Sequence, residues 1–168
     1  MKYTLSLLLL VLYLTACTRP SNDMPAHIWD NPALYDTVSL SDEQLQQGLQ
    51  QAMANNDSFH ISLISFYQGR KFHQDYFLLR AQECYEKARQ YLPVQATSRL
   101  RIELDIAQAD LCRFNHFTGQ ETRLLDNALN LAMHERDSAM LVRIGFIRSR
   151  RYKSKKEFPQ ALAELHNS

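Results

Sequence analysis

Apolar side chains recur along the chain at the three- and four-residue spacing of an amphipathic helix. Leu100, Leu104, Ala107 and Leu111 share one face in this register. A second set keeps the same spacing further along: Leu124, Ala128, Leu131 and Ala132. Such spacing predicts helices that pack through one apolar stripe, because a half-buried strand would alternate with a period of two. We therefore expect an all-α body over residues 41–168, built from antiparallel helical hairpins.

The start of this body is marked by a capping-box sequence, Ser41-Asp42-Glu43-Gln44. The Ser41 hydroxyl can accept from the Gln44 amide while the Gln44 side chain reaches back, so a helix is expected to begin here. It should end near Asn55, where Asn-Asn-Asp-Ser caps a second helix. Gly69 then marks a turn or a close helix contact.

The first seventeen residues follow the pattern of an export signal. One cation at Lys2 precedes an apolar run from Leu7 to Tyr13, and small residues follow it. The run of about ten residues is too short to cross a bilayer, which needs about twenty. We expect residues 1–16 to be a signal peptide, with a spanning anchor as the alternative.

The segment Leu14-Thr15-Ala16-Cys17 resembles the lipobox of bacterial lipoproteins. The resemblance implies a diacylglyceryl group on Cys17, cleavage between Ala16 and Cys17, and palmitate or a similar chain on the new amine. Two or three acyl chains hold a protein on a membrane, since each buried methylene contributes about 0.8 kcal/mol. Thr18, where many inner-membrane lipoproteins carry Asp, favours the outer membrane within the cell envelope. An ordinary secretory signal with a chance cysteine is the alternative.

Residues 17–40 are expected to be a tether. Pro20, Pro25 and Pro32 each remove an amide donor and disfavour helix before them. Trp29 and Tyr35 could pack against the first helix or contact a partner.

Residues 62–95 resemble the tetratricopeptide repeat, an antiparallel helix pair of about 34 residues. The matching positions are Gly69, Phe72, Ala81, Tyr85, Ala88 and Pro93. The resemblance implies a short solenoid of stacked hairpins in which Ala81 and Ala88 allow close helix approach. Tyr85 would fill the groove between hairpins. An unrelated helix bundle is the alternative.

Two weaker copies follow at residues 102–135 and 142–168. The first places Ala109, Cys112, Leu125 and Ala128 at repeat positions, with Glu121 as a departure, and the second offers Ser149, Tyr152, Ala161 and Leu165. Because about three repeats with polar caps are needed for stability, an array that stops here would be capped by a partner or belong to a longer protein.

The charge balance and the absence of several sequence motifs argue against some classes of function. Lysine and arginine (19) nearly cancel aspartate and glutamate (18), so no field of one sign attracts nucleic acid. Cys84 and Cys112 could form a disulfide in an exported protein, but buried free thiols are the favoured reading. No metal-ligand spacing, nucleophile motif or phosphate-binding loop occurs. We expect no enzyme activity, no cofactor, no metal and no nucleic-acid partner.

The expected function is an interaction scaffold or sensor module in the bacterial envelope. In the repeat register, the first helices would line a groove for a partner peptide. The predicted groove residues are Ser65, Gln68, Asp105 and Gln108. The alternative is a periplasmic ligand- or glycan-binding domain that uses the aromatic side chains of Phe66, Tyr67, Tyr76 and Phe77. Adjacent aromatics exposed in one concavity would favour that alternative.

A dense basic run lies near the end of the chain and could contact an anionic surface. It comprises Arg148, Arg150, Arg151, Lys153, Lys155 and Lys156, with Arg143 before it. Each cation close to an anionic membrane contributes about 1 kcal/mol. A solvated helix end stabilised by the helix dipole is the favoured alternative.

Overall fold

The computed structural model describes residues 40–94, 96, 98–154 and 157–166. They lie within one compact unit, residues 31–168. The predicted signal peptide, Cys17 and the tether fall outside the described residues, as do Lys155 and Lys156.

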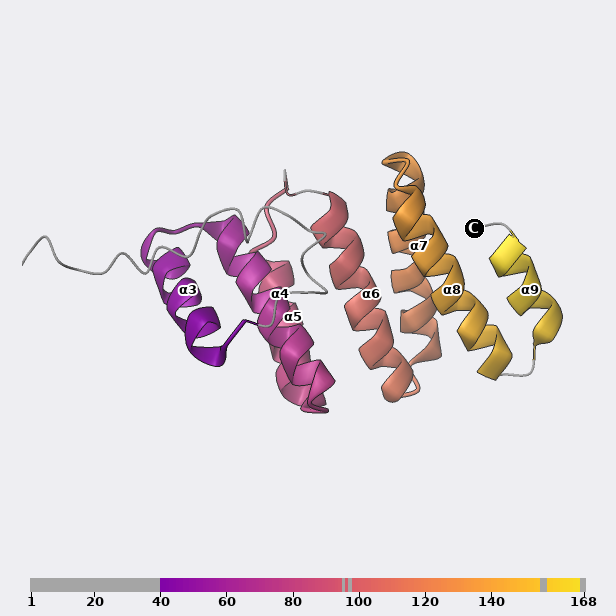
Figure 1. The fold of residues 1–168 in the computed structure, drawn as a ribbon, viewed down its shortest axis with the longest axis horizontal. Coiled ribbons are helices and arrows are strands. Elements are labelled where there is room, and N and C mark those ends of the chain that lie inside the picture. The colour runs from indigo at the N-terminus through magenta and orange to yellow at the C-terminus, as the bar shows by residue number, and fades with distance from the viewer. Residues whose placement is uncertain (1–39, 95, 97, 155–156, 167–168) are drawn as a thin grey trace, which may run out of the picture. The chain divides into compact units, whose positions relative to one another are not determined.

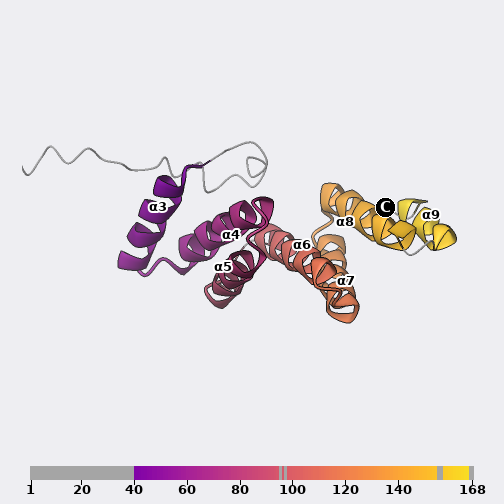
Figure 2. The same cartoon turned by 90° about the horizontal axis from the view of Figure 1, so that it is seen from below.

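The described part of the chain is helical and contains no strand (Figure 1). Its helices are α3 (Asp42–Ala54), α4 (Ser58–Gln74), α5 (Leu78–Gln90), α6 (Ser98–Phe114), α7 (Thr118–His134), α8 (Ser138–Ser154) and α9 (Phe158–His166). The closest packing joins α4 to α5, α6 to α7 and α8 to α9 (Figure 2). The all-α class and the helical hairpins are therefore confirmed. A search of these described helices found none with the length and apolarity to cross a membrane.

The hairpins repeat with a longer period than the sequence comparison suggested. Their first helices, α4, α6 and α8, begin at residues 58, 98 and 138, which are 40 residues apart. Their second helices begin at residues 78, 118 and 158, with the same spacing. Helix α5 is four residues shorter than α7, and a longer connection after it restores the register. Each unit is thus a 40-residue hairpin.

The tight turns between helices share one backbone geometry. The second residue of each turn has a positive φ, and these residues are Asn56, Tyr76, His116 and Arg136. The following amide donates to a carbonyl five residues back, for example from Phe77 to Phe72 at 2.8 Å. This is the Schellman motif, in which glycine usually occupies the left-handed position.

Side-chain caps begin several of the helices. The predicted capping box is confirmed, since the Gln44 amide donates to Ser41 Oγ at 3.2 Å and the Ser41 amide to Gln44 Oε1 at 2.9 Å. Asp57 and Asp137 accept from the amides of His60 and Met140, each at 3.1 Å, in the turns before α4 and α8. These caps satisfy amides that have no partner within the helix.

Small residues let α4 and α5 approach each other closely. Ala81, Ala88 and the whole Tyr85 side chain are fully buried, as the repeat resemblance implied. A Cβ atom on Gly69 would lie 2.5 Å from Tyr85 Cδ1, so no other residue fits there without displacing the ring. Ser62 Oγ also donates to the Ala88 carbonyl at 2.7 Å.

The second hairpin repeats this packing with different side chains. Ala109, Leu125 and Ala128 are buried at the equivalent positions. In the third hairpin, Ser149 is buried and donates to the Phe146 carbonyl at 2.9 Å. The side chains of Ala161 and Leu165 fall outside the described set.

An apolar cluster joins the second hairpin to the third. Its buried members come from α6, α7 and α8 and are Ile102, Ile106, Ala128, Ala132, Met140 and Ile144. Cys84 and Cys112 are free thiols, and no disulfide joins them. Within the part of the chain that the structure describes, the core therefore depends on helix packing without a covalent cross-link.

Candidate functional site

A groove runs along the first helices of the hairpins. It encloses about 550 Å³ and takes its lining from α4, α6 and α8, with Tyr85 of α5 and Tyr76 of the α4–α5 turn completing it. This volume lies within the range of about 300–1,000 Å³ that is typical of ligand pockets.

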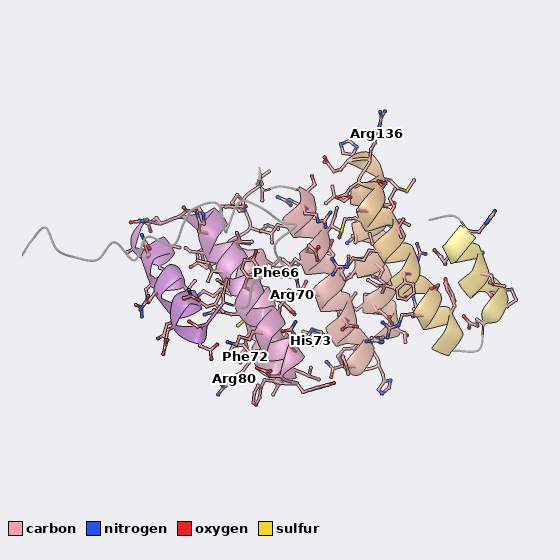
Figure 3. The ribbon with its side chains drawn as sticks, in the orientation of Figure 1. Phe66, Arg70, Phe72, His73, Arg80 and Arg136 are labelled. Carbon is pink, nitrogen blue, oxygen red and sulfur yellow. The ribbon has the colours of Figure 1, made fainter. Side chains whose placement is uncertain are left out.

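One face of each first helix points into the groove. On α4, Phe66, Arg70 and His73 are spaced four and three residues apart, and Figure 3 shows them in succession on the side toward α6. Spacings of three and four residues also relate Ala107, Asp110 and Phe114 on α6 and Arg143, Ile147 and Arg150 on α8. Helical periodicity therefore places all of them on a continuous surface.

The groove has a partly apolar lining beneath its charged groups. Phe66 and Ile106 are buried, while Ile147 is half-buried and Phe114 is 43% exposed. Tyr76 stands at the rim and is 77% exposed. A bound segment could therefore bury apolar side chains as well as form polar contacts.

Positive charge dominates the described lining. Five arginines face two carboxylates there, and they are Arg70, Arg113, Arg143, Arg150 and Arg151 against Glu103 and Asp110. The whole chain has a formal net charge of only +1. Folding thus brings together in one groove more positive than negative side chains, although the two kinds nearly balance over the whole chain.

Glu103 joins α6 to the third hairpin. Its carboxylate is 4% exposed and lies 2.6 Å from Arg143 Nη1 and 3.5 Å from Arg99 Nε. Arg99 continues the network to Asp137 at 2.8 Å. A buried carboxylate is costly unless cations pair with it, and these two arginines neutralise the negative charge of Glu103.

Asp110 is likewise paired with neighbouring side chains in the groove. Arg113 Nη2 lies 2.6 Å from Asp110 Oδ1, and His73 Nε2 lies 3.4 Å from Asp110 Oδ2. The other ring nitrogen of His73 is 3.4 Å from the Tyr85 hydroxyl. These contacts connect α4, α5 and α6 at the groove.

Burial shifts both ring groups of this cluster toward their neutral forms. It lowers the pKa of His73 below 6.5, against the opposing effect of Asp110. Burial also raises the pKa of Tyr85 well above 10. The tyrosine therefore stays protonated at neutral pH, and the cluster offers hydrogen-bonding groups instead of an activated nucleophile.

The four residues predicted for a peptide groove are absent from the lining of this groove, and their contact with a partner stays a prediction. Ser65 is fully buried, and its Oγ has no hydrogen-bond partner among the described residues. Asp105 and Gln108 instead contact Arg89 of α5, at 2.6 and 2.9 Å. Gln68 is half-buried outside the lining. Neighbouring residues on a helix differ by about 100° in direction, so a shift of one or two positions turns a side chain from the groove toward the second helices.

The structure divides the predicted basic run among several environments. Arg148 lies 3.4 Å from Asp126 and 3.3 Å from Glu164, and Arg151 lies 3.7 Å from buried Glu121. Arg150 lines the groove, with its guanidinium 5.9 Å from the Phe146 ring centre. The side chain of Lys153 is outside the described set. The described arginines therefore do not form one solvated patch.

Sequence reasoning missed Arg70, Arg113 and the pairing of Glu103 with Arg143 as groove features. The 40-residue period could have found part of this set, because it aligns Glu103 with Arg143 and Arg70 with Asp110 and Arg150. Charged residues at matching positions of adjacent first helices are natural neighbours in such a stack.

Of the four aromatics proposed for glycan stacking, Phe66 and Tyr76 line the groove, while Tyr67 and Phe77 lie outside its lining. Phe66 is fully buried and Tyr67 half-buried, while Tyr76 and Phe77 are exposed at the α4–α5 turn. Phe77 instead packs edge-on against Phe72, beside Arg80. This arrangement gives the glycan alternative less support than the peptide alternative.

Comparison with protein-family models, curated proteins and solved structures found no match. Among the described residues, no group of three or more His, Cys, Asp or Glu side chains is placed to hold a metal ion. The geometry of the groove is therefore the basis for a functional assignment.

Proposed function

We propose that this chain is a membrane-anchored lipoprotein of the bacterial envelope that acts as a protein-interaction scaffold or sensor module. Its groove would bind a segment of another protein. The observation that carries this proposal is the continuous surface formed by the first helices of three successive hairpins. Helical-repeat proteins use such surfaces for extended binding partners.

The packing of the hairpins supports a relation to tetratricopeptide-like arrays. Gly69, Ala81, Tyr85 and Ala88 perform the close-contact roles that the resemblance implied. The 40-residue period is a departure from the usual length of about 34 residues. The proposal therefore depends on stacked hairpins and their groove, and not on membership of that family.

The groove itself supports binding of a peptide more than catalysis. It combines apolar area with guanidinium, carboxylate and imidazole groups spread over three helices. Rigid helices hold these groups in place, and such preorganisation lowers the entropy lost on binding.

Site-specific photocrosslinking in the envelope of a Gram-negative host tests the groove. A photoreactive phenylalanine analogue would replace Ala107, which lines the groove, and in a matched control Asn127, which is exposed on α7 outside the lining. We expect a discrete crosslinked partner from position 107 and none from position 127. Equal crosslinking at both positions, or crosslinking from position 127 alone, would overturn the assignment of the groove.

The membrane anchor is tested separately by palmitate labelling. The wild-type precursor should incorporate labelled palmitate and lose residues 1–16, while Cys17→Ala should do neither. Labelling that persists in Cys17→Ala would contradict a lipid anchor at this cysteine.

A further inference from the structure

We propose that one edge of the hairpin array lies on the membrane surface to which the chain is anchored. This turn edge is formed by the α4–α5 and α6–α7 turns and carries the exposed side chains of Tyr76, Phe77, Leu79 and Phe117. The inference rests on the proposed lipid anchor, and it adds which surface of the folded body meets the lipid headgroups.

The first argument is the exposure of large apolar side chains at the turn edge. Tyr76, Phe77, Leu79 and Phe117 are each more than half exposed. Phe77 and Phe117 occupy the same position in successive hairpins, because the hairpins repeat every 40 residues. Phe77, Leu79 and Phe117 lie outside the groove lining, so peptide binding in the groove gives them no role. Exposed apolar side chains that gather in one place are typical of a binding surface, whereas single ones are not.

The two turns lie side by side. His73, in the last turn of α4, packs edge-on against Phe114, the last residue of α6, with 5.7 Å between the ring centres. The C-terminal ends of these first helices are therefore neighbours, and the turns that follow them lie at the same edge (Figure 1). Together the turns present one row of apolar side chains.

The second argument is the place where the tether joins the body. Lys71, in the last turn of α4, lies 2.6 Å from Asp42 Oδ1, and its Nζ donates to the Leu40 carbonyl at 3.5 Å. The chain that leads back from Leu40 to Cys17 therefore begins beside the turn edge. An acyl anchor on Cys17 would bring this edge to the bilayer ahead of the opposite one.

The third argument is the chemistry of the turn edge. Amphipathic aromatic side chains such as tyrosine are enriched at the headgroup level of a bilayer. Arg80 is exposed there, with its guanidinium 5.7 Å from the ring centre of Phe72 and 5.9 Å from that of Phe77. A cation beside these rings can meet a lipid phosphate. Asp75 is the single carboxylate within the two turns.

The opposite edge has a different composition. Its α3–α4 and α7–α8 turns contain three carboxylates, those of Asp57, Glu135 and Asp137. The large apolar side chains exposed on this side of the described residues are not aromatic, and they are Met53, Val94 and Met133. Figure 3 shows Arg136 of this edge and Arg80 of the turn edge on opposite sides of the array. This contrast favours the turn edge as the side that faces lipid.

Quenching of tryptophan fluorescence by brominated lipids tests this inference on the full lipidated chain purified from a Gram-negative host. Trp29, the single tryptophan of the sequence, would be replaced by phenylalanine. One reporter would then be introduced as Phe77→Trp, as Phe117→Trp or, at the opposite edge, as Met133→Trp. Met133 is a matched control because it is 59% exposed, as is Phe117.

Each variant would be reconstituted into vesicles of phosphatidylcholine and phosphatidylglycerol. Part of the phosphatidylcholine would carry bromine on its acyl chains, close to the headgroup. Thermal melts of each variant, monitored by circular dichroism, would confirm that it is folded.

We expect bromine to quench the reporters at positions 77 and 117 at least about threefold more strongly than the reporter at position 133. With the reporter at position 117, a larger share of phosphatidylglycerol should increase the quenching, and Arg80→Gln should reduce this increase. Arg136→Gln, which removes the same charge at the opposite edge, should leave the increase unchanged. Equal effects of the two arginine variants would contradict the contact of Arg80 with lipid.

Equal quenching at positions 77, 117 and 133, quenching at position 133 alone, or no quenching at any of them would overturn the inference. If the wild-type chain still incorporated palmitate in any of these cases, the lipid anchor would stand and only the membrane-facing edge would fail. A photoreactive analogue at position 77 that then crosslinked to an envelope protein would assign the turn edge to a protein partner instead. Without palmitate incorporation, the anchor and this inference would fail together.

Discussion

Replacing Gly69 with alanine should destabilise the protein, although alanine is the better helix former. The added Cβ would lie 2.5 Å from two atoms of the Tyr85 ring. That ring is fully buried, with the Phe66 ring 6.0 Å away and the His73 ring 6.3 Å away, so it has little room to move. Overpacking of this kind costs about 1–3 kcal/mol, and the gain in helix propensity returns about 1 kcal/mol. We expect a net loss of up to about 2 kcal/mol in the free energy of unfolding.

Urea denaturation followed by far-ultraviolet circular dichroism would measure this loss. Gly119→Ala is the matched control, since a Cβ there would meet nothing within 4 Å. That variant should be neutral or more stable by up to about 1 kcal/mol. Once Tyr85→Leu has removed the ring, Gly69→Ala should no longer destabilise the chain. A Gly69→Ala variant as stable as Gly119→Ala would refute the argument from close packing.

Three further changes test the turns and the core. Arg136→Gly should raise the free energy of unfolding by about 1 kcal/mol in thermal melts, because glycine adopts the positive φ without strain. Asp137→Ala should lower it by about 1 kcal/mol through loss of the cap. Burial raises the pKa of Asp137, but hydrogen bonds from the Met140 amide and Arg99 outweigh it and leave the pKa below 3.8. The stability from this carboxylate is present above pH 3.8 and lost as pH falls through the lowered pKa, so melts of Asp137→Ala should depend less on acid. Ile102→Ala should lose about 2–5 kcal/mol in urea denaturation, because it opens a cavity in the cluster between the second and third hairpins.

Local signals in the sequence were sufficient to predict the helices and several of their contacts. Ser41 and Gln44 predicted a helix start because a capping box depends on neighbouring residues alone. The repeat resemblance implied close helix contacts at Gly69 and Ala81, because small side chains let two helices approach. The left-handed turns at Tyr76 and His116 carried no such signal, since neither residue is glycine or asparagine.

The groove was harder to predict because its location depends on tertiary packing. Ser65 and Phe66 are adjacent in the sequence, yet Phe66 contributes to the groove and Ser65 does not. Which of the two faces the groove depends on where the second helices and the next hairpin pack. The positive surplus was hidden as well, because acidic residues elsewhere bring the whole chain close to neutrality.

The central claim, that the first helices form a ligand-binding groove in this register, is tested most directly by cysteine accessibility. In a background without native cysteines, the maleimide labelling rates of Ala107→Cys and Ser65→Cys would be compared in the folded and in the unfolded chain. We predict that Ala107→Cys reacts in the folded chain, while Ser65→Cys reacts only on unfolding. Rapid labelling of Ser65→Cys in the folded chain, with slow labelling at position 107, would contradict the account.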